Sequence, residues 1–266
     1  IRDFCLSRGL GDVYKRQAHY QKLVEIVHSY DCRICAQLHQ TDSNMLAMLK
    51  YVPGVLTKKI SMEELRPLLN AEVAPYISKL SARKIHKIIN GFGEAAVLAV
   101  KAGFDMVQVH GDRMCGSFSS TVFNHRTDEY GGSFENRARY ACEIVQTIRK
   151  VVGPKFPILF RISLDHRFNG GRTLEDSVPL LGILEKAGVD AFDVDVASYE
   201  HLDLIYPTVY YGDSVTSYVC KEARKHVSVP IINGGSHTME TAVDLLESGD
   251  ADIIQFGRQL IADPDF

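Results

Sequence analysis

Hydrophobic residues follow two alternating patterns along the chain. Short apolar runs occupy residues 33–38, 105–110, 157–162, 190–196, 229–233 and 251–256. They are apolar through most of their length, as parallel strands covered on both faces are. Between them, apolar residues recur at helical spacing. Ser81 is expected to cap a helix that stops at Gly103, Ser133 precedes a second helix that runs to Val152, and Thr173 starts a third that ends at Gly188. The alternation predicts a parallel sheet whose strands are joined by crossover helices.

Helix boundaries repeat with the same chemistry. Three helical stretches end in a glycine and enter a strand through an aspartate, in KAGFD at 101–105, KAGVD at 186–190 and ESGDAD at 247–252. Such repetition is typical of consecutive βα units. We therefore predict an α/β fold, a TIM (β/α)₈ barrel that lacks its first two strands and last helix, in one domain of residues 18–266. A doubly wound open sheet is less favoured, because no GxGxxG follows any strand.

Two segments do not fit this pattern. Residues 1–17 follow neither a helix nor a strand period, and DVYKRQ at 12–17 resembles a translated sequencing adapter, so we interpret 1–17 as a non-native leader. Residues 40–80 contain Pro53, Pro67 and Pro75 and little periodicity. We interpret that segment as a long irregular connection with a lid-like role.

Composition excludes several classes of protein. A net charge of −3 without a basic run gives no reason to expect nucleic acid as a partner, and no apolar run reaches the length of a membrane span. Six scattered cysteines suggest a reducing compartment, hence the cytoplasm. Cys32 and Cys35 form a CxxC inside an apolar run, which we interpret as two packed thiols, and no metal site is predicted. The sequence leaves a homo-oligomer open.

The last two strands end in groups that suit a phosphate. The run VPIIN stops at Gly234 and Gly235 just before a helix that begins near Thr238, and the final strand ends at Gly257 and Arg258. In barrels the loops after strands seven and eight commonly bind phosphate through backbone N–H groups and a helix N-terminus. The alternative is a pair of tight turns with a surface arginine.

Polar residues within or directly after other strands are candidates for binding. Arg161 lies among apolar neighbours, so it must pair with a carboxylate such as Asp193 or Asp195, or face an anionic ligand. Gln37 could hydrogen-bond the edge of a heterocycle in both directions. Each residue alone would more often be structural.

The loop after the strand 105–110 carries the candidate catalytic groups. His110 in isolation would be a satisfied core histidine, but Asp112 and Arg113 follow it closely. His110 could polarise a carbonyl, and Arg113 could add positive charge for an oxyanion or a carboxylate.

These motifs resemble a known family. AQLH at 36–39, AGFDMVQVHG at 102–111, HRTDEYGGSFENRARY at 125–140, FRIS at 160–163, NGG at 233–235 and FGRQLIADPD at 256–265 resemble the Old Yellow Enzyme group of FMN-dependent ene-reductases, relatives of the 2-enoate and 2,4-dienoyl-CoA reductases. The resemblance implies FMN at the carboxyl end of a barrel and NAD(P)H as co-substrate, with a small-molecule alkene as substrate. It places Gln37 at the flavin pyrimidine, Arg161 at the flavin ring edge, His110 at the substrate carbonyl, and Gly234, Gly235, Gly257 and Arg258 at the phosphate. The 4Fe–4S and FAD modules of longer relatives would belong to a C-terminal extension.

The chain departs from the family's common pattern after His110. That pattern is His-Gly-Ala, then Asn or His, then Gly-Tyr, whereas this chain has HGDRMC, with Arg113 at the second donor and Cys115 at the tyrosine. The HGDR sequence resembles that of gut bacterial bilirubin reductases, which reduce the methine bridges of bilirubin to give urobilinogen. Asp112 or Arg113 would then deliver the proton, and Asp112 could also orient Arg113. An enoate, dienoyl-CoA or steroid enone substrate remains an alternative, as does a phosphate-binding barrel without redox chemistry.

Overall fold

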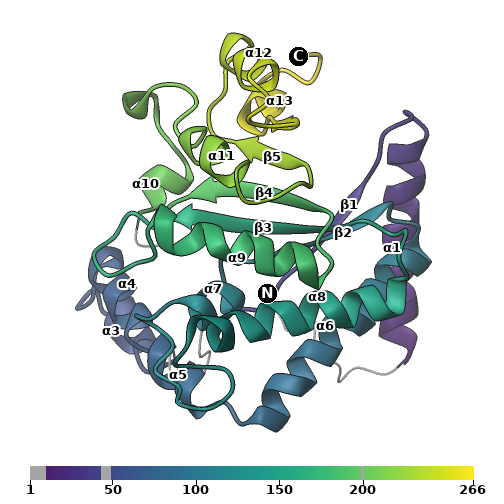
Figure 1. Ribbon diagram of the computed structural model, residues 1–266. Helices are drawn as coiled ribbons and strands as arrows, with labels where there is room; N and C mark the ends of the chain where they lie inside the picture. Colours follow the sequence, from purple (N-terminus) through teal and green to yellow (C-terminus); the bar gives the residue numbers. More distant parts are fainter. Residues whose placement is uncertain (1–9, 43–48, 199–200) are drawn as a thin grey trace.

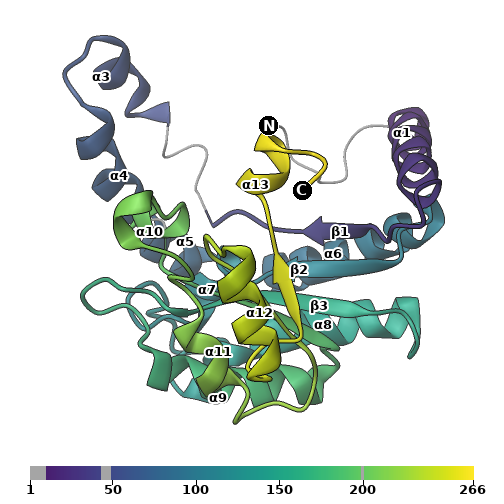
Figure 2. The ribbon, with the colours of Figure 1, turned by 90° about the horizontal axis from the view of Figure 1, so that it is seen from above.

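Six parallel strands form one curled sheet in the computed structural model, which describes residues 10–42, 49–198 and 201–266. Their order in the sheet follows the chain: β1 (Cys35–Leu38), β2 (Met106–His110), β3 (Ile158–Asp165), β4 (Ala191–Val196), β5 (Ile231–Gly234) and β6 (Ile253–Gln255). All six predicted strands are confirmed to within three residues. Figure 2 shows β6, the yellow strand that leads to α13, running at a steep angle to β1. The two strands differ in direction because the sheet curls into a half-barrel. The sequential order excludes the doubly wound alternative, which requires a reversal of strand order.

Helices cover the outer face of the half-barrel. They include the long helices α6 (Ala82–Ala102), α8 (Phe134–Val152) and α9 (Leu174–Ala187), and the shorter α11 (Tyr218–Ala223) and α12 (Met239–Glu247) follow. Figure 1 shows α8 and α9 alongside β3, the strand that both of them contact. Fully buried side chains such as Ile144, Ile148, Phe160 and Phe192 fill the layer between helices and sheet. Each such side chain contributes roughly 1.5–3 kcal/mol through burial.

The predicted helix ends are confirmed by their capping contacts. The Ser81 hydroxyl accepts from the backbone N–H of Lys84 at 3.3 Å, and α6 ends at Gly103 with φ of +92°. Ser133 caps α8 in the same way, and Thr173 forms a reciprocal capping box with Asp176 at the start of α9. Such caps satisfy backbone N–H groups that have no partner within the helix.

The interpretation of residues 1–17 as irregular is wrong for residues 10–17. The helix α1 (Leu10–His28) includes them. A helix gains one hydrogen bond per residue once it is nucleated, and Leu, Lys, Arg and Gln are good helix formers, so α1 extends beyond its packed part without an apolar stripe. Its packed part contains Val24, which is buried, and Tyr20, which is partly exposed. The ring of Tyr20 meets the ring of Phe104 edge-on, with 5.9 Å between their centroids. The assignment of 1–17 as a non-native leader stays a prediction.

The irregular connection expected at residues 40–80 is also wrong in part. Residues 49–80 contain α3 (Val52–Leu56), α4 (Met62–Asn70) and α5 (Val73–Lys79), whereas residues 43–48 lie outside the described part of the chain. Pro53 and Pro75 lie in the first turns of α3 and α5, where a missing N–H costs nothing. These two prolines therefore lie at helix starts, and the third, Pro67, lies inside α4. A lid-like role for the segment stays a prediction.

The remaining elements are short and lie mostly in the loops after the strands. They are α7 (Met114–Ser119), α10 (Leu202–Ile205), the 3₁₀ helix η1 (Val209–Tyr211) and α13 (Arg258–Ala262). Cys32 precedes β1, and both it and Cys35 are exposed, so the expectation of two packed thiols is wrong. Cys35 lies on the same exposed face of β1 as Gln37, whereas Ala36 and Leu38 face the core. Among the described residues, no group of three His, Cys, Asp or Glu side chains could hold a metal ion, and no helix is long and apolar enough to cross a membrane.

Candidate active site at the carboxyl edge of the sheet

A layer of polar side chains lies inside the half-barrel. Asp193 on β4 is 1% exposed, and its Oδ2 accepts from Gln108 Nε2 on β2 at 2.9 Å and from Gln255 Nε2 on β6 at 3.2 Å. The three side chains come from alternate strands, as the interior layers of (β/α)₈ barrels do. Gln108 Oε1 in turn accepts from Gln37 Nε2 at 2.6 Å. The predicted residue Gln37 is thus joined to three other strands.

Arg161 pairs with carboxylates of β4, one of the two arrangements expected from its apolar neighbours. Its Nη2 forms an ion pair with Asp195, and its Nη1 lies 3.6 Å from Asp193 Oδ2. Burial by itself would lower the pKa of Arg161, but Asp195 and Asp193 outweigh burial and raise it. The second oxygen of Asp195, Oδ1, is buried and has no hydrogen-bond partner among the described residues. Arg161 is therefore a permanent cation whose charge is shared between two carboxylates.

His110 is a neutral hydrogen-bond donor at the end of β2. The backbone N–H of Asp112 donates to His110 Nδ1 at 3.3 Å, so in the neutral imidazole the proton lies on Nε2. Burial, followed by the positive charges of Arg161, His39 and Arg113, lowers the pKa of His110 to about 4. The ring centroid of His39 lies 6.2 Å away. At neutral pH His110 can donate a hydrogen bond without carrying charge.

Asp112 and Arg113 have different described partners. The Asp112 carboxylate accepts from the backbone N–H of Ser163 on β3 at 2.5 Å, and burial raises its pKa despite the nearby Arg161 and Arg172. Arg113 Nη1 instead lies 3.7 Å from Asp42 Oδ1. Asp42 is thus a carboxylate that pairs with Arg113, and the orienting role expected of Asp112 stays a prediction. Spacing could not show this, because Asp42 lies in the loop after a different strand.

Cys115 does not occupy the site. It is a residue of α7, is 5% exposed and belongs to the hydrophobic core. Burial raises the pKa of its thiol well above the usual range. Asp42, by contrast, accepts from Ser117 Oγ at 2.6 Å, which ties the loop after β1 to α7. The thiol is therefore part of the packing and not a replacement for the family's tyrosine.

Sequence reasoning missed a buried arginine behind this loop. Arg172 is 7% exposed, and its guanidinium donates to Ser119 Oγ at 2.5 Å and to the Ser163 carbonyl at 3.1 Å. It also lies 2.9 Å from His166 Nε2, and burial followed by this positive charge lowers the pKa of His166 to about 2. The available signal was a charged residue directly before the Thr173 helix cap. Arg172 joins α7 to the end of β3.

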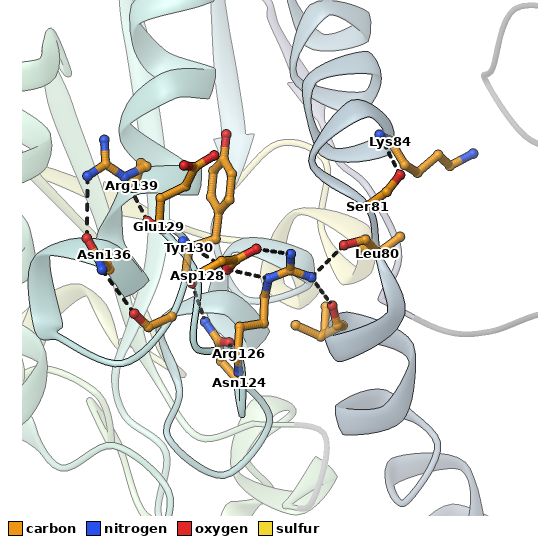
Figure 3. Close-up of polar contacts among 12 residues, drawn as sticks. Leu80, Ser81, Lys84, Asn124, Arg126, Asp128, Glu129, Tyr130, Asn136 and Arg139 are labelled. Carbon is orange, nitrogen blue, oxygen red and sulfur yellow. Dashed lines mark hydrogen bonds and ion pairs between the residues drawn. The ribbon is translucent and has the colours of Figure 1, made fainter.

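The motif HRTDEYGG at 125–132 connects the loop after α7 to the end of α5 (Figure 3). Arg126 Nη1 donates to the carbonyls of Ile77 at 2.7 Å and Leu80 at 2.6 Å, where α5 ends. Its Nε donates to Asp128 at 2.9 Å. A Cβ on Gly131 would lie 2.2 Å from the Arg126 carbonyl oxygen, so the tight turn requires glycine. This motif positions the loop and makes no described contact with His110.

The predicted phosphate residues meet at the ends of β5 and β6. Arg258 Nη2 donates to Ser236 Oγ at 2.6 Å, which joins the loop after β6 to the loop after β5. A Cβ on Gly235 would lie 2.1 Å from Thr216 Oγ1, and one on Gly234 would lie 3.0 Å from Gln255 Cβ. Gly257 is exposed and borders open space. The glycines and Arg258 form a cationic rim with accessible backbone, which fits the phosphate of a nucleotide cofactor.

The residues present fit a flavin mononucleotide. The amide of Gln37 and the guanidinium of Arg161 are hydrogen-bonding groups for a heterocycle, and the exposed Gln37 lies on the inner face of the sheet. Arg258 with the glycine loops offers the phosphate end. His110 adds a neutral donor at the same edge.

The chain belongs to the NADH:flavin oxidoreductase / NADH oxidase family, which it matches over residues 14–266. It is 43% identical over 256 residues to a bilirubin reductase of Clostridium symbiosum, a match that covers 93% of this chain and 68% of that protein. It is 33% identical over 262 residues to a cinnamate reductase of Clostridium sporogenes, covering 91% of this chain and 38% of that protein. The old yellow enzyme homologue from Zymomonas mobilis superposes with a TM-score of 0.59 at 28% identity, over 70% of this chain and 51% of that one. The fold is thus that of this family's barrel.

Proposed function

We propose that the protein is an FMN-dependent ene-reductase that uses NAD(P)H to reduce activated C=C bonds, with the methine bridges of bilirubin as its substrate. The observation that carries the proposal is the convergence of His110, Arg161 and Gln37 at the carboxyl edge of the sheet. The likeness to a bilirubin reductase over nearly the whole chain supports the choice of substrate.

The cofactor residues keep the roles predicted for them. Gln37 and Arg161 would bind the flavin ring, and Gly234, Gly235, Gly257 and Arg258 would bind its phosphate. When bound, FMN would supply the hydride-transfer chemistry between NAD(P)H and a carbon of the alkene. The protein's own groups supply binding, orientation and a proton.

His110 and Arg113 would bind the substrate. A neutral Nε2–H of His110 donates to a carbonyl conjugated with the reacting bond and stabilises the charge that develops on it. Bilirubin offers lactam carbonyls for His110 and propionates for a cation. Arg113, held near Asp42, would pair with such a carboxylate.

Asp112 is the better of the two candidates for proton delivery. A guanidinium does not give up its proton in proteins, whereas burial raises the pKa of the Asp112 carboxyl and so favours its acid form. Its hydrogen bond from Ser163 N–H fixes one carboxylate oxygen and leaves the other to carry the proton. Arg113 is then a substrate-binding residue.

Anaerobic turnover tests this proposal. The purified chain is supplied with FMN and with NADH or NADPH, and bilirubin loss is followed by absorbance. We expect turnover, and a loss of at least about tenfold in kcat/KM for Arg113→Ala, since one charge-assisted pair contributes roughly 1.5–3 kcal/mol. Arg83→Ala, at an exposed position in the first turn of α6, is the matched control and should retain activity. Turnover in which Arg113→Ala equals the wild type would contradict the assignment.

A second candidate substrate is an unsaturated carboxylate. The likeness to a cinnamate reductase favours it, and a single carboxylate would suit Arg113 as well as a propionate does. A panel of bilirubin, cinnamate, an enoyl-CoA and a steroid enone separates these substrates. Reduction of cinnamate with no loss of bilirubin would select the alternative, and a colourless protein that binds no flavin would exclude both.

A further inference from the structure

A directional chain of hydrogen bonds links Gln37 on β1 to the buried carboxylate of Asp193 on β4, three strands away. Gln37 Nε2 donates to Gln108 Oε1 at 2.6 Å, and Gln108 Nε2 donates to Asp193 Oδ2 at 2.9 Å. Gln108 is 8% exposed and Asp193 is 1% exposed, whereas Gln37 is exposed on the inner face. The buried end of the chain is therefore fixed, and its exposed end is available to a ligand.

The charge of Asp193 determines the direction of both amides. An ionised carboxylate only accepts hydrogen bonds, so Gln108 must turn its NH₂ group toward Asp193. The Gln108 carbonyl oxygen then faces Gln37, so Gln37 must donate to it from its own NH₂ group. This leaves Gln37 Oε1, on the opposite side of its amide, as an acceptor for a third group. The orientation of an amide follows from its hydrogen-bond network. Here the Asp193 carboxylate determines the orientation of two amides, those of Gln108 and Gln37.

Three neighbouring donors face one oxygen of Asp193, Oδ2. Gln255 Nε2 donates to the same oxygen at 3.2 Å, and Arg161 Nη1 lies 3.6 Å from it. Burial raises the pKa of Asp193, and the guanidinium and the two amides act against burial. Two amides and a cation thus converge on one oxygen, an arrangement suited to a carboxylate.

We propose that Asp193 is a positioning residue that acts through Gln108 to make Gln37 present its carbonyl oxygen to the imide N–H of the flavin pyrimidine. The inference rests on the proposed function, because it takes FMN as the ligand. Reversal of the two amides would place an NH₂ group opposite the imide N–H and lose that hydrogen bond. Asp193 thereby determines which heterocycle edge the site accepts.

Asp195 provides a matched control on the same strand. It pairs with Arg161, as Asp193 does, but its described hydrogen bond goes to that guanidinium and not to an amide. If the preference for a flavin with an imide N–H depends on Arg161, it should fall in both aspartate variants. If it depends on the two amides, it should fall in Asp193→Asn and in Gln108→Leu. The Gln108→Leu variant interrupts the hydrogen-bond chain and keeps both aspartates.

The test compares FMN with its N3-methyl analogue, which lacks the imide N–H. Dissociation constants for the two are measured by quenching of flavin fluorescence in the wild type, Asp193→Asn, Gln108→Leu and Asp195→Asn. We expect the wild type to bind FMN at least about tenfold more tightly than the analogue, because the analogue lacks the imide N–H that would donate to Gln37 Oε1. The ratio should fall to about twofold or less in Asp193→Asn and Gln108→Leu. It should stay near the wild-type value in Asp195→Asn, whatever happens to the absolute affinity.

Each outcome decides one question. A wild type that binds no FMN removes the proposed function and this inference together. FMN binding with an unchanged ratio in Gln108→Leu overturns the inference and leaves the proposed function standing, and an equal fall in Asp195→Asn overturns it in favour of Arg161. If Asp193→Asn does not fold, Gln108→Leu decides alone, because leucine fills a similar volume without a buried polar atom.

Discussion

At the scale of single residues, the environment determines what each side chain can do. His110 is a half-buried imidazole that ends a strand at the open edge, whereas His166 is buried against the Arg172 guanidinium. The sequence identified His110 because it follows a strand and precedes charged residues. It could not identify the Asp42 partner of Arg113, since sequence spacing carries no information on contacts between loops of different strands.

His166 makes stability depend on pH. Burial and Arg172 lower its pKa from 6.5 to about 2, so between these values the unfolded chain binds a proton that the folded chain does not. The free energy of unfolding therefore falls as pH falls through 6.5, by roughly 1 kcal/mol between pH 7 and 5.5 for this residue. Urea unfolding at the two pH values should show a smaller fall in His166→Gln than in the wild type. The exposed His125→Gln serves as control, and an equal fall in all three proteins would refute the assignment.

At the scale of elements, caps and periodicity predicted the long helices and all six strands. Ser81, Ser133 and Thr173 each begin a helix as expected, because a side-chain acceptor there satisfies a free backbone N–H. The helices between residues 49 and 80 were missed because they are short and contain prolines, and because tertiary packing decides whether such segments are helical. The buried Ile77 of α5 belongs to the same core as α7.

Arg126 should stabilise the junction of α5 with the loop after α7. Its side chain is 7% exposed and binds two carbonyls at the end of α5 as well as Asp128. Arg126→Ala leaves these groups without their donor, so we expect a loss of about 2–4 kcal/mol in the free energy of unfolding. Arg139→Ala, whose exposed guanidinium donates to the Glu129 carbonyl, should lose under about 1 kcal/mol. Equal urea midpoints for the two variants would show that the motif does not brace the loop.

At the scale of the whole molecule, the curl of the sheet creates the site. Gln37, Gln108, Asp193 and Gln255 come from four strands and meet because a curled parallel sheet brings inward-facing side chains together. The sequence predicted that strand ends would gather at one edge, and it predicted Gln37, Arg161 and the glycines as separate candidates. It did not predict the hydrogen bonds that join them, because the tilt of the strands determines which inward-facing residues meet.

FMN binding at that edge is the central claim, and a comparison of FMN with riboflavin tests it most directly. Titrations of the purified chain followed by flavin fluorescence should show binding of both, with FMN preferred by at least about tenfold through its phosphate. Arg258→Ala should reduce that preference and leave riboflavin affinity within about twofold, since Arg258 lies at the phosphate rim and joins the two glycine loops. A chain that binds neither flavin, or that binds both equally in the wild type and the variant, would contradict the account.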